Sequence, residues 1–428
     1  MGIDPALEPD DLYAELEGRA QARRAARTMR RRRPFRFARG SRHGPSILAS
    51  RGGRLLAVAA GLLALVTLAG LILLWPSGTV GHATGALGGQ TLPARVVSPS
   101  LVNCPGPVPQ RCRALAIRVA GHDASVLVGP VGSSPKIESG AAIRVSPEPA
   151  VPGAAGQTYT YVDRDRRGSL LWLAIALAIA AVVVLWWRGA LALAGVALSL
   201  LVVTKFVVPG ILVGRPALLI ALVGSLAVMW VTLVLTNGLG AQTLAAALGI
   251  GGTLLAVAGL ASFATHFAHL NGFSGDVSLA LSQQQHGLSL QGVVLAGMVI
   301  GALGVLADTA VTQASAAMAL RRANPELTAR PLFGAAFTVG RDHLSATIHT
   351  LVLAYVGGAL PLLLVLRSSG VGLTDALNTQ DVAEPIVASV VGCLGLVLAV
   401  PLTTALASSL IARVPADLVP DAHRTHAH

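Results

Sequence analysis

Charged side chains are scarce in this chain. Only 12% of its 428 residues are Asp, Glu, Lys or Arg, and 53% are hydrophobic, whereas about 25% of an ordinary soluble domain is charged. This balance excludes a soluble globular protein and indicates a membrane protein. Lysine is almost absent, with Lys136 and Lys205 as the only two, while Arg, Ala and Gly abound, which is typical of translation from a GC-rich bacterial genome.

The sequence motifs of several membrane and ATP-driven enzymes are also absent. There is no H-E-x-x-H, so a zinc membrane protease would lack its ligands, and no G-x-x-x-x-G-K loop that would bind ATP. Asp308 has no second aspartate within the apolar segments, which a two-carboxylate mechanism would require. We therefore expect no enzyme activity, no cofactor and no metal site.

Cysteine occurs three times. Cys104 and Cys112 lie eight positions apart in the polar segment NCPGPVPQRC. A metal site would need two more ligands nearby, and none is evident, so a disulfide that closes a small extracytoplasmic loop is the favoured interpretation. Cys393 falls in a hydrophobic segment, where we expect it to serve in packing.

Long hydrophobic runs dominate the rest of the chain. About 20 consecutive apolar residues suffice to cross a bilayer as a helix. Eight such runs are present, at residues 55–75, 169–187, 190–212, 216–236, 243–263, 291–313, 344–366 and 385–411. The first is longer than the apolar part of a secretory signal, so we interpret it as an uncleaved anchor. The sequence predicts an α-helical polytopic membrane protein.

Arginine is distributed unevenly between the two sides of these predicted spans. About a dozen Arg residues lie between Arg19 and Arg54, and most of the others fall on the same side. The positive-inside rule then places the N- and C-termini in the cytoplasm of a bacterial cell, with the spans in its inner (plasma) membrane. We expect the basic tail, residues 1–54, to be largely disordered and to contact anionic lipids rather than nucleic acid.

The segment between the first two predicted spans, residues 76–168, reads as a small extracytoplasmic β domain. The runs RALAIRVAG, ASVLVGPVG, AAIRV and TYTYV are rich in β-branched residues and are separated by Gly and Pro. A small barrel-like fold is expected. The full predicted order is tail 1–54, span 55–75, β domain 76–168, spans within 169–263, external loop 264–290, spans within 291–412 and cytoplasmic tail 413–428.

The sixth predicted span carries small and polar residues at helical spacing. They are Gly297, Gly301, Gly304, Asp308, Thr312 and Ser315, at steps of three or four. Residues at these steps share one helix face, and glycines on a face allow close helix packing in lipid. An acid inside a span costs about 2.5–3.5 kcal/mol on insertion scales, so Asp308 needs a partner, a proton or water.

The seventh predicted span begins with a polar cluster at a similar depth. Asp342, Ser345 and His349 are three and four apart and share a face, and Arg341 stands beside them. We expect Arg341 and His349 to meet Asp308. Two hypotheses stay open. The cluster could form a proton- or ion-coupled site with Arg341 as an anion clamp, or it could only cap the helix and hold the cytoplasmic loop 319–343.

The eighth predicted span offers a second face of small residues. Gly392 and Gly395 lie on it, and we expect both to serve in helix packing. Pro401 follows on the same span and should loosen the helix. Together with the two preceding spans, this segment would form a compact core around Asp308.

From residue 295 onward the chain resembles the YibE/F-like family of bacterial membrane proteins. The resemblance rests on three segments, GMVIGALGVLADTAVTQASAAMALRRANPEL, LFGAAFTVGRDHLSATIHTLVLAYVGGALPLLL and ALNTQDVAEPIVASVVGCLGLVLAVPLTTALA. It extends less specifically to about residues 80–412. His343, His349 and Gln380 stand where the family pattern is associated with an apolar residue, an amide and an acid. The resemblance implies a multi-spanning protein that looks like a permease.

Two functions are compatible with the sequence. The first is a permease for a small solute or ion, coupled to a proton or ion gradient through Asp308. The second is a membrane scaffold or envelope-assembly factor whose β domain binds an extracytoplasmic partner. The sequence identifies neither the solute nor the oligomeric state.

Overall fold

A computed structural model describes residues 51–77, 91–105, 109–148, 158–275, 278, 281 and 288–413. Most of the predicted basic tail and of the C-terminal tail lies outside the described residues, as does part of the expected loop 264–290. The expectations for those tails therefore stay predictions.

Eight helices in this part of the chain are long and apolar enough to cross a membrane. The spans are α2 (Arg51–Leu73), α3 (Arg167–Leu185), α4 (Trp187–Val202) continued by η2 (Val203–Val207) and α5 (Val208–Leu212), α6 (Ala217–Asn237), α7 (Ala241–Phe267), α9 (Leu290–Ala323), α10 (Ala329–Ser368) and α12 (Gln380–Ile411). A short helix, α11 (Leu373–Asn378), precedes α12. The predicted polytopic helical fold with a small β domain is confirmed.

Two of the helices extend well past the apolar runs that predicted them. Helix α9 continues ten residues beyond 313, and α10 begins fifteen residues before 344. Only residues 324–328 connect them, so the predicted loop 319–343 is wrong. Both extensions contain residues that favour helix without being strongly apolar, such as Ala and Arg. A hydropathy criterion therefore ends the helix too early there.

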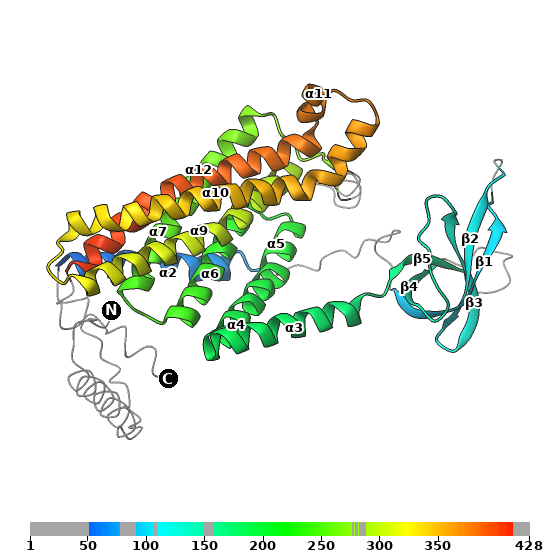
Figure 1. Cartoon of the computed structure of the whole chain (residues 1–428), viewed down its shortest axis with the longest axis horizontal. Coiled ribbons are helices and arrows are strands. Elements are labelled where there is room, and N and C mark those ends of the chain that lie inside the picture. The colour runs from blue at the N-terminus through cyan, green and yellow to red at the C-terminus, as the bar shows by residue number, and fades with distance from the viewer. Residues whose placement is uncertain are drawn as a thin grey trace, which may run out of the picture. The chain divides into compact units, whose positions relative to one another are not determined.

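The packed centre of the helical part consists of α7, α9 and α12, against which α10 packs with only three buried residues. Helix α12 contacts the other three, and α7 also contacts α9; Figure 1 shows α10 and α12 running side by side. The buried positions of α7 and α9 are rich in small residues, among them Ala245, Ala246, Ala310 and Ala314. Small side chains let helix backbones approach closely where lipid provides no hydrophobic driving force.

Helix α3 contrasts with this centre because it has no buried residue. It packs against α4 in a tight hairpin, whose turn places Trp186 at a φ of 54°. A Cβ atom placed at Gly189 would lie 2.2 Å from the Ala181 carbonyl oxygen. Gly189 therefore allows the close approach of the two helices, and a larger residue would separate them.

The third span contains a local π-helical turn, η2. Pro209 is the second residue after it. A proline has no N–H and its ring clashes with the carbonyl four residues earlier, so the chain widens locally. Lys205 lies on this turn and is exposed. Its long side chain can reach the interface from there.

The β domain is an antiparallel five-stranded sheet in the order β3-β2-β1-β4-β5. Its strands are β1 (Leu92–Asn103), β2 (Arg111–Val119), β3 (His122–Pro130), β4 (Ala142–Pro147) and β5 (Tyr159–Arg164). Strands β3 and β5, at the two edges, also come into contact, so the sheet curls as the sequence predicted. It encloses a separate core that includes Leu115, Ile117 and Ile143.

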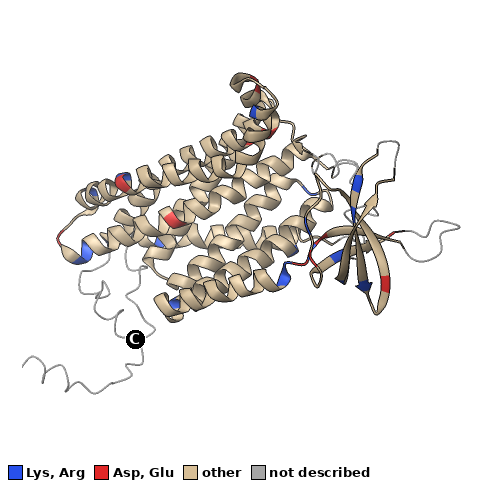
Figure 2. Ribbon diagram, turned by 45° about the vertical axis from the view of Figure 1, so that its right-hand side comes forward, with Lys and Arg blue, Asp and Glu red and all other residues tan. Residues whose placement is uncertain are grey.

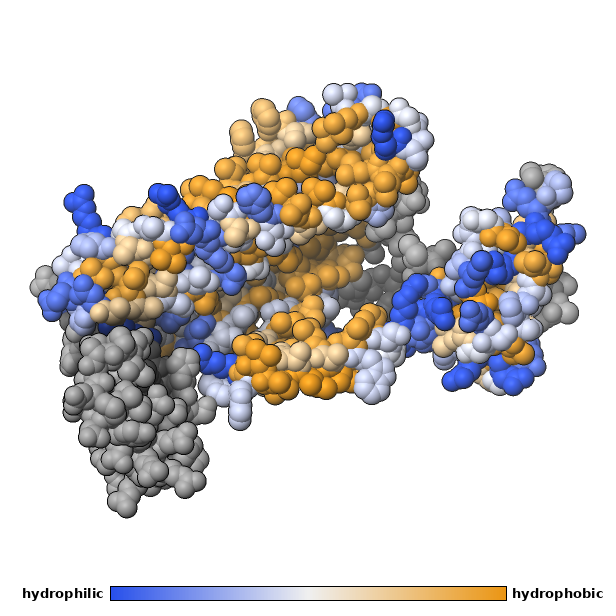
Figure 3. Space-filling view, viewed as in Figure 1, coloured by the Kyte–Doolittle hydropathy of each residue, from blue (hydrophilic) through white to orange (hydrophobic). Residues whose placement is uncertain are grey.

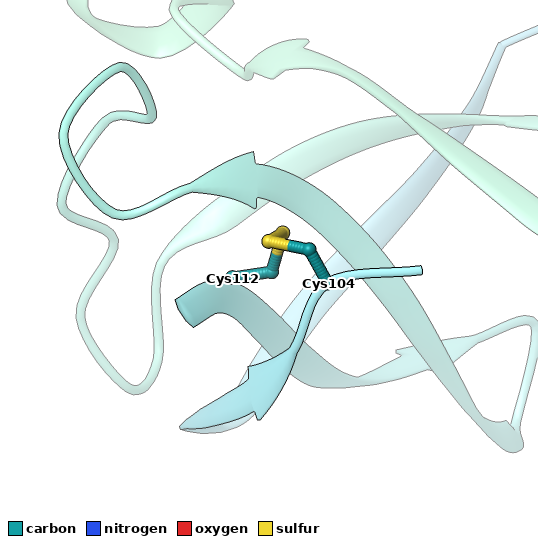
Figure 4. The surroundings of a disulfide bond; sticks show 2 residues. All are labelled: Cys104 and Cys112. Atoms are coloured by element: carbon teal, nitrogen blue, oxygen red, sulfur yellow. A yellow bond between two sulfur atoms is a disulfide. The ribbon is translucent and has the colours of Figure 1, made fainter. Parts of the chain in front are cut away.

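Cys104 and Cys112 form the disulfide that their spacing suggested, with 5.0 Å between their Cα atoms. Figure 4 shows the bond joining the end of β1 to the start of β2. These two strands are paired, with Val102 opposite Cys112. The bond therefore closes a hairpin whose strands are already aligned.

Two ion pairs lie on the surface of this domain. Arg118 bonds Asp123 at 2.8 Å across the β2–β3 turn, and Arg166 bonds Asp163 at 2.5 Å where β5 leads into α3. In each pair the hydrogen bond from the Arg side chain lowers the pKa of the aspartate. Both pairs are exposed to solvent, so we assign them little weight in stability.

Candidate functional site

The face of small residues on α9 borders open space rather than another helix along much of its length. A Cβ atom placed at Gly297 or Gly304 would meet no atom within 4 Å. The prediction that these two glycines pack against a neighbouring helix is therefore wrong. At Gly301 the nearest atom is the Tyr355 hydroxyl oxygen, 3.3 Å from the placed Cβ, so this glycine does lie at a contact with α10.

A groove of about 610 Å³ opens beside Gly304 and Asp308. It lies between α4, α6 and α9, and its walls are largely apolar, with Ser199, Thr232 and Asn237 among the few polar side chains. The Asp308 side chain is 70% exposed. Asp308 is therefore a carboxylate in the middle of a membrane-spanning helix that faces an accessible groove instead of a packed core.

The partner of Asp308 comes from α10, as predicted, but it is His343. The His343 Nε2 atom lies 3.8 Å from Asp308 Oδ2, a distance that allows charge attraction and exceeds that of a hydrogen bond. His343 Nε2 has no hydrogen-bond partner within the described residues. The two side chains can thus interact as an ion pair when the imidazole is protonated.

Arg341 and His349, which the sequence placed at Asp308, are exposed instead. His349 Nδ1 lies 2.7 Å from the Ser345 carbonyl oxygen of its own helix, to which it can donate. Asp342 and Ser345 are exposed as well, so the expected shared face exists but does not pack on the bundle. The expectation that Arg341 and His349 meet Asp308 is wrong.

The start of α10 explains which residue faces inward. Leu332, Ala336 and Gly340 are the buried positions of this helix, and His343 follows at the same helical spacing. Arg341 and Asp342 lie a dozen residues inside the helix, so they do not cap it. Thr312, one turn beyond Asp308 on α9, is half-buried.

A buried amide that sequence reasoning missed lies next to Thr312 on α9, five residues beyond Asp308. Gln313 is fully buried, and its Oε1 accepts a hydrogen bond of 3.0 Å from the Thr404 hydroxyl of α12. A Cβ atom placed at Gly340 of α10 would lie 2.7–2.8 Å from the Gln313 amide group. Gln313 therefore joins three helices. It is the last residue of the predicted apolar run 291–313, and no motif in the sequence singles it out.

Ser315 forms the third polar contact in this part of α9. Gln242 of α7 donates a hydrogen bond of 2.5 Å from Nε2 to the Ser315 hydroxyl. With the Asp308–His343 and Gln313–Thr404 contacts, this pair makes a polar layer about 10 Å deep along α9. Asp308 and His343 are the ionisable side chains in these pairs, so they are the candidates for chemistry.

The two glycines of α12 lie at helix contacts, as their spacing suggested. A Cβ atom placed at Gly392 would be 3.0 Å from the Leu351 side chain of α10, and one at Gly395 would be 2.5 Å from the Val257 side chain of α7. These positions keep α12 close to its neighbours. They serve the packing of the core rather than a binding site.

Charged side chains are sparse along the helices, as Figure 2 shows. The outer surface of the helices is mainly hydrophobic in Figure 3, where the β domain shows more hydrophilic residues. No group of three or more His, Cys, Asp or Glu residues that could hold a metal ion occurs among the described residues. Asp308 and His343 are therefore unusual in their surroundings.

The family model for YibE/F-like proteins matches residues 173–413, more than half of the chain. The match begins within α3, after the β domain, and includes Asp308, Gln313 and His343. No curated protein and no solved structure matches the chain. On the strength of the family match, this chain belongs to the YibE/F-like family.

Proposed function

We propose that this protein transports a small solute or ion across a membrane, and that Asp308 couples the movement to a proton or ion gradient. One observation carries the proposal. The Asp308 side chain is 70% exposed, and it borders a groove of about 610 Å³ between membrane-spanning helices. A purely structural acid in a span would be expected to be enclosed and fully paired.

The chemistry of this site suits reversible binding of a cation or proton. A charged carboxylate is costly in hydrocarbon, and a groove that admits water or a cation offsets that cost. The protonated His343 imidazole competes for the same carboxylate from 3.8 Å away. Binding of a cation at Asp308 would therefore weaken the attraction between Asp308 and His343, which couples occupancy to one contact between α9 and α10.

The proposed orientation follows from the basic residues at the helix ends. Arg321 and Arg322 end α9, and Arg330 begins α10. We propose that this end faces the cytoplasm of a bacterial cell, with the spans in its inner membrane. The Arg-rich N-terminal tail would then contact anionic lipids on the same side. We also propose that the protein acts without catalysis.

The test is a transport measurement with purified protein in proteoliposomes. A panel of radiolabelled small solutes is screened with and without an imposed pH gradient. We expect Asp308→Asn to insert and fold normally but to lose gradient-driven uptake, because the amide cannot exchange a proton or hold a cation. Asp342→Asn, which neutralises an exposed acid on α10, is the matched control and should transport as the wild type does.

A different result would remove the coupling role. Asp308→Asn transport that retains the gradient dependence of the wild type would mean that Asp308 does not couple. A variant that fails to fold would instead favour a structural pair between Asp308 and His343.

The alternative function is a membrane scaffold whose β domain binds an envelope partner. The observation in its favour is that this domain has a hydrophobic core of its own and a disulfide. The two functions predict different results when the β domain alone is damaged. A scaffold would lose its activity, whereas the helices of a transporter would still bind and move solute.

A further inference from the structure

A second cavity, of about 400 Å³, borders the other end of the small-residue face of α9. Gly297 lines it, eleven residues and about 16 Å along the helix from Asp308. Helices α10 and α12 and the loop after α7 form the remaining walls. The two cavities thus lie along one helix, with Gly301 and the Tyr355 hydroxyl between them.

The loop after α7 is held in place at the start of α12. With its amide oriented so that the oxygen faces the loop, Gln380 accepts hydrogen bonds from the backbone N–H groups of Gly272 and Phe273, at 2.6 and 3.1 Å. Gly272 has a φ of 83°, and a Cβ atom there would lie 2.4 Å from the Leu290 backbone. The loop therefore has a defined path that only glycine permits at this position.

This loop brings Ser274 to a carboxylate inside the cavity. The Ser274 hydroxyl donates a hydrogen bond of 3.0 Å to Oε2 of Glu384, which lies in the second turn of α12. Both residues line the cavity, and both are half-buried. Glu384 makes no ion pair with the Lys, Arg or His side chains of the described residues. No cationic side chain of the described residues therefore compensates a charge on this carboxylate.

The remaining walls indicate which ligand suits this charge. Tyr355 contributes an aromatic side chain, and Val294, Met298 and Pro385 contribute apolar surface. A bare metal ion would need several more oxygen ligands than one carboxylate and neighbouring hydroxyls provide. An organic cation suits the cavity better, because its charge can meet a carboxylate or an aromatic ring while its alkyl groups contact apolar walls.

We propose that the cavity beside Glu384 binds a small organic ammonium cation, held by the Glu384 carboxylate and the Tyr355 ring. This inference rests on the proposed transport function, of which it names the substrate class. The cavity would be the entry site, and the face of α9 would lead from it toward Asp308. The size of the cavity falls within the usual range of about 300–1,000 Å³ for small-molecule sites.

The test measures binding of matched probes to the full chain in detergent by isothermal titration calorimetry. Choline, tetramethylammonium and benzyltrimethylammonium are the cationic probes, and 3,3-dimethylbutan-1-ol is the uncharged analogue of choline. We expect at least one of these cations to bind. If choline binds, the uncharged alcohol should bind at least about tenfold more weakly than choline.

Substitutions then assign the binding to the cavity. Glu384→Gln preserves the shape of the side chain and should lower cation affinity about tenfold or more. Asp375→Asn removes an exposed charge from α11, outside the cavity lining, and should leave affinity unchanged. Tyr355→Leu should weaken binding, whereas Tyr355→Phe should preserve it.

Three results would overturn the proposal. They are the absence of binding by all three cations, equal binding of choline and its uncharged analogue, and wild-type affinity in a folded Glu384→Gln variant. The measurement needs no gradient and no transport. Cation binding that persists in Asp308→Asn, together with gradient-driven uptake that also persists in that variant, would support this inference while rejecting the proposed coupling.

Discussion

The contact between Asp308 and His343 shows how single positions are selected by helix geometry. Arg341, His343 and His349 lie within nine residues of α10, but only His343 faces α9. Successive residues on a helix differ by about 100° in direction. A polar cluster in the sequence therefore contains both inward- and outward-facing groups. The residues that share a helix face with the buried positions are the inward-facing ones.

The most restrictive position near this site is Gly340. We predict that Gly340→Ala destabilises the protein by about 1–3 kcal/mol, because the added methyl group would press on the Gln313 amide and force α10 away from α9. Thermal unfolding in detergent measures the effect. Gly334 is the matched control on the same helix, since a Cβ atom there meets nothing within 4 Å.

Alanine at position 334 should be neutral or slightly stabilising, because alanine favours helix over glycine by up to about 1 kcal/mol. Equal thermal midpoints for the two variants would contradict the assigned contact. In a Gln313→Ala background, Gly340→Ala should cost little further stability, and that result would support the contact, since the obstructing side chain would then be shorter.

At the scale of helices, the existence of every span could be predicted, while several ends could not. Hydropathy identified all eight spans because about 20 apolar residues leave few other structures for a membrane protein. It set the start of α10 at residue 344, although the helix begins at Ala329. Packing of Leu332, Ala336 and Gly340 against the bundle stabilises this first part, and tertiary contacts of that kind are not encoded in local hydropathy.

The same limit applies to the candidate site. Asp308 could be selected from sequence because an acid within an apolar run is conspicuous. Its groove could not be predicted, since the open space beside Gly304 depends on how α4 and α6 lie against α9. Glu384 was overlooked for a related reason, because it sits near a helix start, where charges commonly face water.

Because α10 is continuous through Arg341 and Asp342, a proline in this segment should be far more damaging than it would be in a loop. Val339→Pro should destabilise the protein by about 3 kcal/mol or more, because proline removes a backbone hydrogen bond inside α10 and clashes with the preceding turn. Thermal unfolding and monodispersity on size-exclusion chromatography are the measurements.

Ala329→Pro provides the comparison for that substitution. Position 329 is the first residue of α10, where proline is favoured because its N–H would be unpaired in any case. We expect this variant to remain close to the wild type. Equal tolerance of proline at both positions would indicate that α10 begins after Val339.

For the whole molecule, the separate cores of the β domain and the helices imply separate stabilities. The core around Leu115 and Ile143 shares no residue with the buried clusters of the helices. The family match likewise covers the helices and begins after the domain. Function at Asp308 and Glu384 should therefore depend on the helices, with the β domain acting as an independent unit.

The disulfide allows this independence to be tested in the full chain. Replacing Cys104 and Cys112 together by Ser should destabilise the β domain by about 2–3 kcal/mol on a chain-entropy estimate for a loop of this length. Hydrogen exchange followed by mass spectrometry should show faster exchange in peptides from β1 and β2, while peptides from α7, α9 and α12 keep the protection of the wild type.

Cation binding and gradient-driven uptake by the same double variant then distinguish the two candidate functions. A transporter whose path lies along α9 should keep both activities when only the β domain is loosened, because its binding groups lie in the helices. A scaffold should lose its cellular role under the same treatment. If α9 also lost its protection from hydrogen exchange along with β1, the two cores would unfold together. The assignment of function to the helices alone would then fail.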